Sequence, residues 1–147
     1  MYAALGVHSG LACGAARDLP SAMAAMRGQH TAGPGLVAKS VHTPTIVFHG
    51  DRDATVHPRN GGHVMEQARS GSDLRIVVEQ GTAPSGYSFT RSVQNDASGR
   101  GFFEQWEIHG AGHAWLGGSP AGSFTDPKGP DATREMLRFF LEHARQN

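Results

Sequence analysis

Two short segments of the sequence carry residue types suited to acid–base catalysis. Residues 49–58 contain two carboxylates, Asp51 and Asp53, and residues 110–115 place His113 on a glycine-bearing loop. A histidine side chain takes up and releases protons near neutral pH. A carboxylate bonded to its ring fixes the tautomer and stabilises the imidazolium form. The two segments therefore predict a histidine general base paired with an aspartate.

The apolar patterns around these segments predict the elements that hold them. Strands are predicted from β-branched and aromatic runs, over residues 2–7, 45–48 and 74–78 and in a hairpin with arms 88–94 and 102–108. Helices are predicted from apolar residues at helical spacing, over residues 18–27, 60–69 and 131–145. This alternation predicts an α/β fold of mostly parallel strands with flanking helices and a late hairpin. Such folds place functional loops after the carboxyl ends of strands, where both segments stand.

The helix ends carry recognisable signals. Gly28 follows the first predicted helix as a C-terminal stop, and Asn60 is a candidate N-cap of the second. Pro130 suits the first helical position of the third. The inward face of that last helix is predicted from its apolar stripe: Thr133, Met136, Leu137, Phe140, Leu141 and Ala144.

Composition excludes several classes of function. The 147 residues balance 13 Lys and Arg against 13 Asp and Glu, so no basic surface for nucleic acid or an anionic membrane is expected. No run approaches the ~20 apolar residues of a membrane span. The single cysteine, Cys13, excludes a disulfide within the chain and a cysteine-rich zinc site.

Three stretches together resemble the poly(hydroxybutyrate) depolymerase-like esterases. They are residues 48–56 (FHGDRDATV), 110–118 (GAGHAWLGG) and 129–132 (GPDA), and residues 6–10 and 21–27 also look like that family. These esterases are serine hydrolases of the α/β-hydrolase fold, a three-layer sandwich, and are related to feruloyl and acetylxylan esterases. The resemblance implies Asp53 as the triad acid and His113 as the general base, with Asp51 as the nearer rival for the acid. It implies no cofactor and a carboxylic ester as substrate, either a polyester or a small acyl or aryl ester.

The sequence departs from that family at the nucleophile. No serine stands in a Gly-x-Ser-x-Gly elbow, because Ser9 is one residue out of register and Ser119 follows the histidine. We therefore expect residues 1–147 to form a single partial domain, the C-terminal portion of such an enzyme, without its serine or oxyanion hole. The chain alone should be inactive. Its strands over 2–7 and 45–48 should expose an unpaired edge that favours self-association or a complementing N-terminal segment.

Two alternatives to the esterase interpretation remain open. A metal-dependent hydrolase would draw on six residues, namely His49, Asp51, Asp53, His57, His109 and His113. The glycines between His109 and His113 argue against the helix that would turn both rings toward one metal. A non-catalytic binding or assembly remnant is the other alternative.

Individual side chains near the two segments also have structural interpretations. His49 and His57 are assigned structural roles, since a strand-end loop needs partners for its free backbone groups. Trp115, next to the candidate base, either lines a substrate pocket or packs under its loop. Trp106 is assigned to the core.

Overall fold

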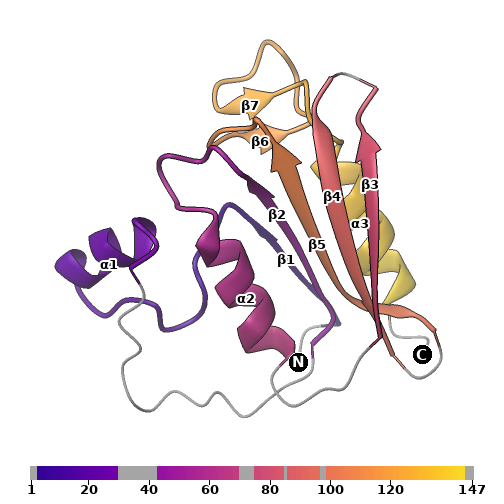
Figure 1. Ribbon diagram of the computed structural model, residues 1–147, viewed down its shortest axis with the longest axis horizontal. Coiled ribbons are helices and arrows are strands. Elements are labelled where there is room, and N and C mark those ends of the chain that lie inside the picture. Colours follow the sequence, from indigo (N-terminus) through magenta and orange to yellow (C-terminus); the bar gives the residue numbers. More distant parts are fainter. Residues whose placement is uncertain (1–2, 30–42, 70–74, 85, 97–98, 145–147) are drawn as a thin grey trace.

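A five-stranded sheet with helices on both faces organises the chain (Figure 1). The computed structural model describes residues 3–29, 43–69, 75–84, 86–96 and 99–144. The sheet contains β1 (Leu5–His8), β2 (Thr45–Gly50), β3 (Arg75–Thr82), β4 (Ser88–Asn95) and β5 (Gly101–His109) in the order β1-β2-β5-β4-β3. The helices are α1 (Leu19–Met26), α2 (Arg59–Arg69) and α3 (Ala132–Glu142). The predicted α/β class is therefore confirmed.

The strands run parallel at one side of the sheet and antiparallel at the other. β1, β2 and β5 are parallel neighbours, whereas β4 pairs antiparallel with both β5 and β3. The predicted hairpin is therefore present as β4 and β5. Two further strands of two residues each, β6 (Trp115–Leu116) and β7 (Thr125–Asp126), pair in the segment between β5 and α3, where no strand was predicted.

The interior strand β2 is buried along its whole length. Its alternate residues face opposite sides: Ile46 and Phe48 join the core under α3, and Val47 joins the core under α2. Such two-sided burial explains the continuous apolar run. Because β2 lies between β1 and β5, the expected open edge over residues 45–48 is wrong.

α1 and α3 begin at side-chain caps. The Asp18 carboxylate accepts a hydrogen bond from the Ser21 N–H, and the Ser21 hydroxyl accepts one from the Asp18 N–H, forming a capping box at α1. Gly28 follows with a φ of 75°, as its predicted stop requires. At α3 Asp131 is the N-cap, so Pro130 precedes the helix rather than opening it. Asn60 lies inside α2 and does not cap it.

The buried face of α3 differs from the predicted stripe. Ala132, Met136 and Phe139 face the sheet, whereas Leu137 and Leu141 are 56% and 67% exposed. The inward row extends to residue 143, a histidine whose Nε2 lies 2.9 Å from the Gly101 carbonyl. The hydrophobic pattern did not predict this row, because one of its buried positions is occupied by a polar residue, His143.

A buried carboxylate joins the hairpin to α3. Glu104 on β5 is 1% exposed and accepts hydrogen bonds from Arg91 on β4, Arg138 on α3 and the Trp106 indole. Burial would raise the pKa of Glu104, but its bonds to the two arginines lower that pKa below the usual value. Trp106 itself is 6% exposed, as its assignment to the core predicted. None of the described helices is both long enough and apolar enough to span a bilayer.

Candidate functional site

The two segments predicted to carry acid–base chemistry meet at one edge of the sheet. β2 and β5 are parallel neighbours with Gly50 beside Ile108, so both chains leave the sheet at the same end. The Asp51 N–H donates to the Ile108 carbonyl at 3.0 Å, and the Arg52 N–H donates to the Ala111 carbonyl at 3.0 Å. Parallel pairing therefore positions the carboxylates of one loop beside the histidine of the other.

Asp53 and His113 form a hydrogen-bonded pair. Nδ1 of His113 lies 2.8 Å from Oδ2 of Asp53, across 60 residues of sequence. The other carboxylate oxygen, Oδ1, accepts the backbone N–H groups of Thr55 at 2.9 Å and Val56 at 2.8 Å. An ionised carboxylate only accepts, so Nδ1 of His113 donates and its Nε2 is left as the acceptor. That is the tautomer required of a general base.

Burial and hydrogen bonds act in opposite directions on Asp53. The residue is 4% exposed, and this desolvation by itself raises the pKa of the carboxyl. The N–H of Val56, the His113 ring and the N–H of Thr55 outweigh it, so the pKa lies below its ordinary value. Asp53 is therefore an anion at neutral pH. The side chain of His113 is 38% exposed, which leaves its outer edge open to a reactant.

Asp51, the rival for the acid role, serves a different histidine. Its Oδ2 lies 3.1 Å from Nδ1 of His109, and its Oδ1 accepts the Gly110 N–H at 2.7 Å. Nε2 of His109 lies 2.9 Å from the hydroxyl of Thr90 on β4. Asp51 thus holds the start of the loop that carries His113, and it makes no hydrogen bond to His113 itself within the described residues.

His49 and His57 both contact backbone in the loops around the site. His49 is 2% exposed, and its Nε2 lies 2.8 Å from the Val56 carbonyl and 3.4 Å from Oδ2 of Asp53. His57 accepts the Arg59 N–H at 3.2 Å through Nδ1. His49 therefore packs behind the carboxylate, whereas His57 lies at the start of α2.

His8 also lies at the candidate site, which the sequence around it gave little reason to predict. It ends β1, and its ring stacks on Trp115 with centroids 4.7 Å apart. Burial, followed by repulsion from His49 and His113, lowers the pKa of His8 to about 4. This contact could not be predicted from local patterns, because His8 and Trp115 are far apart along the chain and meet only through the order of the strands in the sheet.

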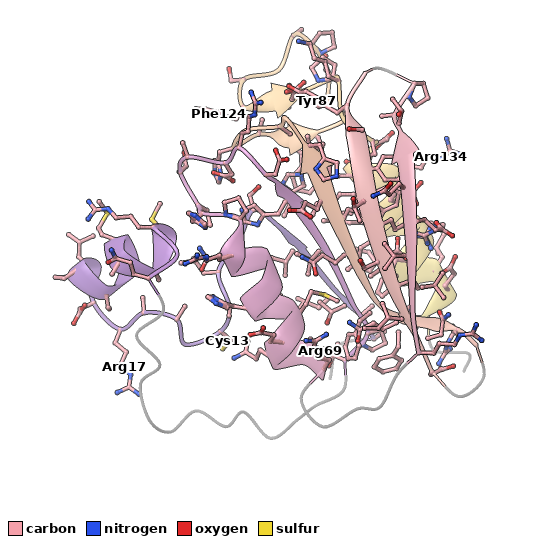
Figure 2. All side chains as sticks on the ribbon, in the orientation of Figure 1. Cys13, Arg17, Arg69, Tyr87, Phe124 and Arg134 are labelled. Atoms are coloured by element: carbon pink, nitrogen blue, oxygen red, sulfur yellow. The ribbon has the colours of Figure 1, made fainter. Side chains whose placement is uncertain are left out.

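Two exposed aromatic residues lie in the segment of chain that follows His113. Trp115 is 39% exposed, and its indole N–H donates to the Thr133 hydroxyl on α3 at 3.0 Å. Phe124 is 84% exposed and takes a left-handed backbone with a φ of 61°. The Phe124 carbonyl accepts the Trp115 N–H at 2.8 Å. Figure 2 shows Phe124 at the same end of the molecule as Tyr87. Sequence reasoning missed Phe124, because nothing in its local pattern marks it as exposed.

Neither serine singled out in the sequence bonds to His113. Ser9 follows β1 with a φ of 48°, and its hydroxyl oxygen is buried without a hydrogen-bond partner among the described residues. Ser119 lies in the exposed loop between β6 and β7, where its hydroxyl accepts the Ala121 N–H at 3.3 Å. A buried hydroxyl cannot reach an ester in this conformation, and an exposed loop hydroxyl without a basic partner is not activated.

The six residues of the metal alternative do not form one cluster, and His57 contacts the Arg59 N–H. Asp53 lies with His113 and His49, whereas Asp51 lies with His109. In the part of the chain that the structure describes, no three His, Cys, Asp or Glu side chains converge in a way that could hold a metal ion. The metal alternative gains no support from this geometry.

A pocket of about 450 Å³ opens on the α3 side of the sheet. Phe89 and Trp106 belong to its lining, together with the start of α3. Neither Asp53 nor His113 lines it, so this pocket is separate from the candidate site.

Comparison with models of protein families and with curated proteins found no match to this chain.

Proposed function

We propose that this chain supplies the acid and base of a carboxylic-ester hydrolase. The observation that carries the proposal is the 2.8 Å hydrogen bond between Asp53 and His113 at the carboxyl edge of parallel strands. A buried carboxylate that accepts Nδ1–H leaves Nε2 of a half-exposed imidazole free to take a proton. The resemblance of both loops to poly(hydroxybutyrate) depolymerase-like esterases selects this class of reaction.

His113 moves one proton in each half of the proposed reaction. Nε2 takes the proton of a serine hydroxyl as the serine oxygen bonds to the ester carbonyl carbon. It then gives this proton to the alcohol oxygen as the carbon–oxygen bond breaks, leaving an acyl-enzyme. Water repeats the cycle and releases the acid. Asp53 stays ionised throughout and stabilises the imidazolium, and the reaction requires no cofactor.

The serine and the oxyanion-hole donors come from outside these 147 residues in this proposal. The sequence holds no Gly-x-Ser-x-Gly elbow. The parallel order β1-β2-β5, with helices on both faces, supports the C-terminal portion of an α/β-hydrolase domain. A complementing segment or a partner chain would then bring the nucleophile to Nε2 of His113.

The substrate in this proposal is a polyester or a small acyl or aryl ester. Trp115, two residues after His113, and Phe124, whose carbonyl accepts the Trp115 N–H, are both exposed. In this proposal they contact the acyl or aryl part of the ester, since aromatic surfaces bury apolar groups effectively. The alternative of a non-catalytic binding or assembly protein gives no reason for a buried Asp53 to hold His113 in the tautomer of a base.

Nitrogen-15 NMR of the histidine side chains tests the Asp53–His113 pair in this chain alone. We expect His113 to carry its proton on Nδ1 at neutral pH, with the signal assigned from its loss in His113→Gln. Asp53→Ala should release that tautomer, whereas His57→Gln should leave it unchanged. An Nε2-protonated His113 in the wild-type chain would contradict the proposal.

A chimera tests the activity. The elbow-bearing N-terminal half of a poly(hydroxybutyrate) depolymerase-like esterase would be fused before this chain and assayed with a short-chain nitrophenyl ester. We expect turnover that falls by about 10⁴-fold in Asp53→Asn. The unfused chain should give neither turnover nor a fluorophosphonate adduct. An adduct on Ser9 or Ser119 of the unfused chain, abolished by His113→Ala, would show that the chain has its own nucleophile.

A further inference from the structure

β3 forms one edge of the sheet (Figure 1). Three consecutive aliphatic residues of this strand are exposed to solvent. Ile76, Val77 and Val78 are 52%, 37% and 59% exposed. Among the described residues β3 pairs with β4 alone, so its outer edge carries free backbone N–H and C=O groups. Natural proteins usually shorten, cover or charge such edges, because they template pairing with another chain. The eight residues of β3 have no charge between Arg75 and Glu79.

The two residues that flank the aliphatic run carry opposite charges. Arg75 precedes it and Glu79 follows it, each two residues from Val77. Both are exposed; Glu79 binds Arg91 of β4 at 2.9 Å, and Arg75 forms no ion pair with a described residue. The segment 75–79 is therefore complementary to itself when a second strand runs in the opposite direction.

We propose that the outer edge of β3 binds β3 of a second copy of this chain, antiparallel about a two-fold axis through Val77. In this register Arg75 of each copy faces Glu79 of the other, and Ile76 faces Val78. Directly opposite charges and aliphatic side chains stabilise a strand pair. The axis is normal to the sheet, so each face continues from one copy into the other. The contact is isologous, which closes at a dimer.

Other arrangements of the same edge match less well. A parallel pair in register sets Arg75 against Arg75 and Glu79 against Glu79, and like charges in facing positions destabilise. An antiparallel pair slipped by two residues sets Val77 against Glu79 and leaves the charges unpaired. A slip of one residue turns the aliphatic side chains to opposite faces. The sequence therefore specifies both the direction and the register of the contact.

β3 also fits a second copy better than the other edge of the sheet does. β1 is four residues long, and its sequence, LGVH, contains no acidic or permanently charged side chain that would fix a register. The self-association expected from residues 2–7 is therefore assigned to β3. This inference is independent of the ester-hydrolase proposal.

Sedimentation velocity across a concentration series tests the contact with charge reversals. The wild-type chain should show a monomer–dimer equilibrium. Arg75→Glu and Glu79→Lys should each raise the dimer Kd by about tenfold or more, because two attractive pairs become repulsive. An equal mixture of the two variants should recover dimers, because every facing pair is then opposite in charge. Arg17→Glu makes the same charge change on the far side of the molecule (Figure 2) and should leave Kd unchanged.

A third variant tests the axis itself. Val77→Lys sets two ammonium groups face to face on the proposed axis and should leave the chain monomeric, with circular dichroism confirming that it folds. A wild-type chain that stays monomeric at every concentration overturns the proposal. So does a dimer whose Kd is unaffected by Val77→Lys, or a mixture of Arg75→Glu and Glu79→Lys that associates no better than its components.

Discussion

The imidazole of His8 lies against the indole of Trp115, with ring centroids 4.7 Å apart and ring planes 21° apart. Nε2 of His8 also accepts the Leu116 N–H at 3.2 Å, across 108 residues of sequence. His8 ends the edge strand β1, whereas Trp115 and Leu116 directly follow the loop of His113. A neutral histidine thus ties the loop of the candidate base to the far side of the parallel strands.

This contact predicts a loss of stability in mild acid. The pKa of His8 is about 4 in the folded chain, against 6.5 for an ordinary histidine, because burial and the nearby His49 and His113 oppose its charge. Between these pH values His8 is protonated in the unfolded chain but neutral in the folded chain. The free energy of unfolding should therefore fall as the pH drops from 6.5 to 4, by up to about 1.4 kcal/mol per pH unit. Urea unfolding at a series of pH values measures it.

His8→Gln isolates that contribution. Glutamine can still accept the Leu116 N–H but does not titrate, so its unfolding free energy should vary less with pH between 6.5 and 4. His57→Gln removes an exposed histidine and should keep the wild-type slope. Identical slopes in wild type and His8→Gln would contradict the assignment. The lowered pKa values of Asp53 and Glu104 act at lower pH, where their loss of charge destabilises the fold further.

Local patterns were enough to predict the five strands of the main sheet and the two loops of the candidate site. β2 is a continuous apolar run that ends in a polar loop, and the glycines around His113 mark another loop after a strand. Each signal lies within a few neighbouring residues. The aspartate and the histidine could therefore be predicted to meet once the strands were taken as parallel.

The positions that the sequence did not predict depend on contacts between distant elements. The stacking of His8 on Trp115 follows from sheet order, which no local pattern specifies. Glu104 is a charge inside a strand, and only Arg91 from β4 and Arg138 from α3 explain its burial. The inward face of α3 was predicted wrongly because the polar His143 occupies one of its buried positions.

Removal of the buried carboxylate should destabilise the chain strongly. Glu104→Ala leaves two guanidinium groups and the Trp106 indole N–H without their shared acceptor. Breaking a buried ion pair at one partner costs about 3–5 kcal/mol. Glu107→Ala removes an exposed carboxylate from the same strand and should change the free energy of unfolding by less than about 0.5 kcal/mol. Equal effects in the two variants, measured by urea unfolding, would show that the cluster does not hold the hairpin to α3.

Gly50 should be required for the Asp53–His113 pair although it has no side chain. A Cβ at Gly50 would overlap the Ala111 carbonyl group and lie 2.9 Å from the Gly112 carbonyl oxygen. Gly50→Ala should therefore push the His113 loop away from the loop of Asp53. We expect a cost of about 1–3 kcal/mol in unfolding free energy, together with loss of the Nδ1-protonated tautomer of His113.

Gly112→Ala is the matched control, because a Cβ at Gly112 meets no atom within 4 Å. The same substitution, in the same loop contact, should therefore leave both the unfolding free energy and the His113 NMR signal near their wild-type values. If Gly50→Ala behaved like Gly112→Ala, the close approach of the β2 end to the Ala111 carbonyl would not be what positions His113. The alignment of Asp53 with His113 would then rest on the other contacts between the two loops, such as those of Asp51 with His109 and Gly110 and that of the Arg52 N–H with the Ala111 carbonyl.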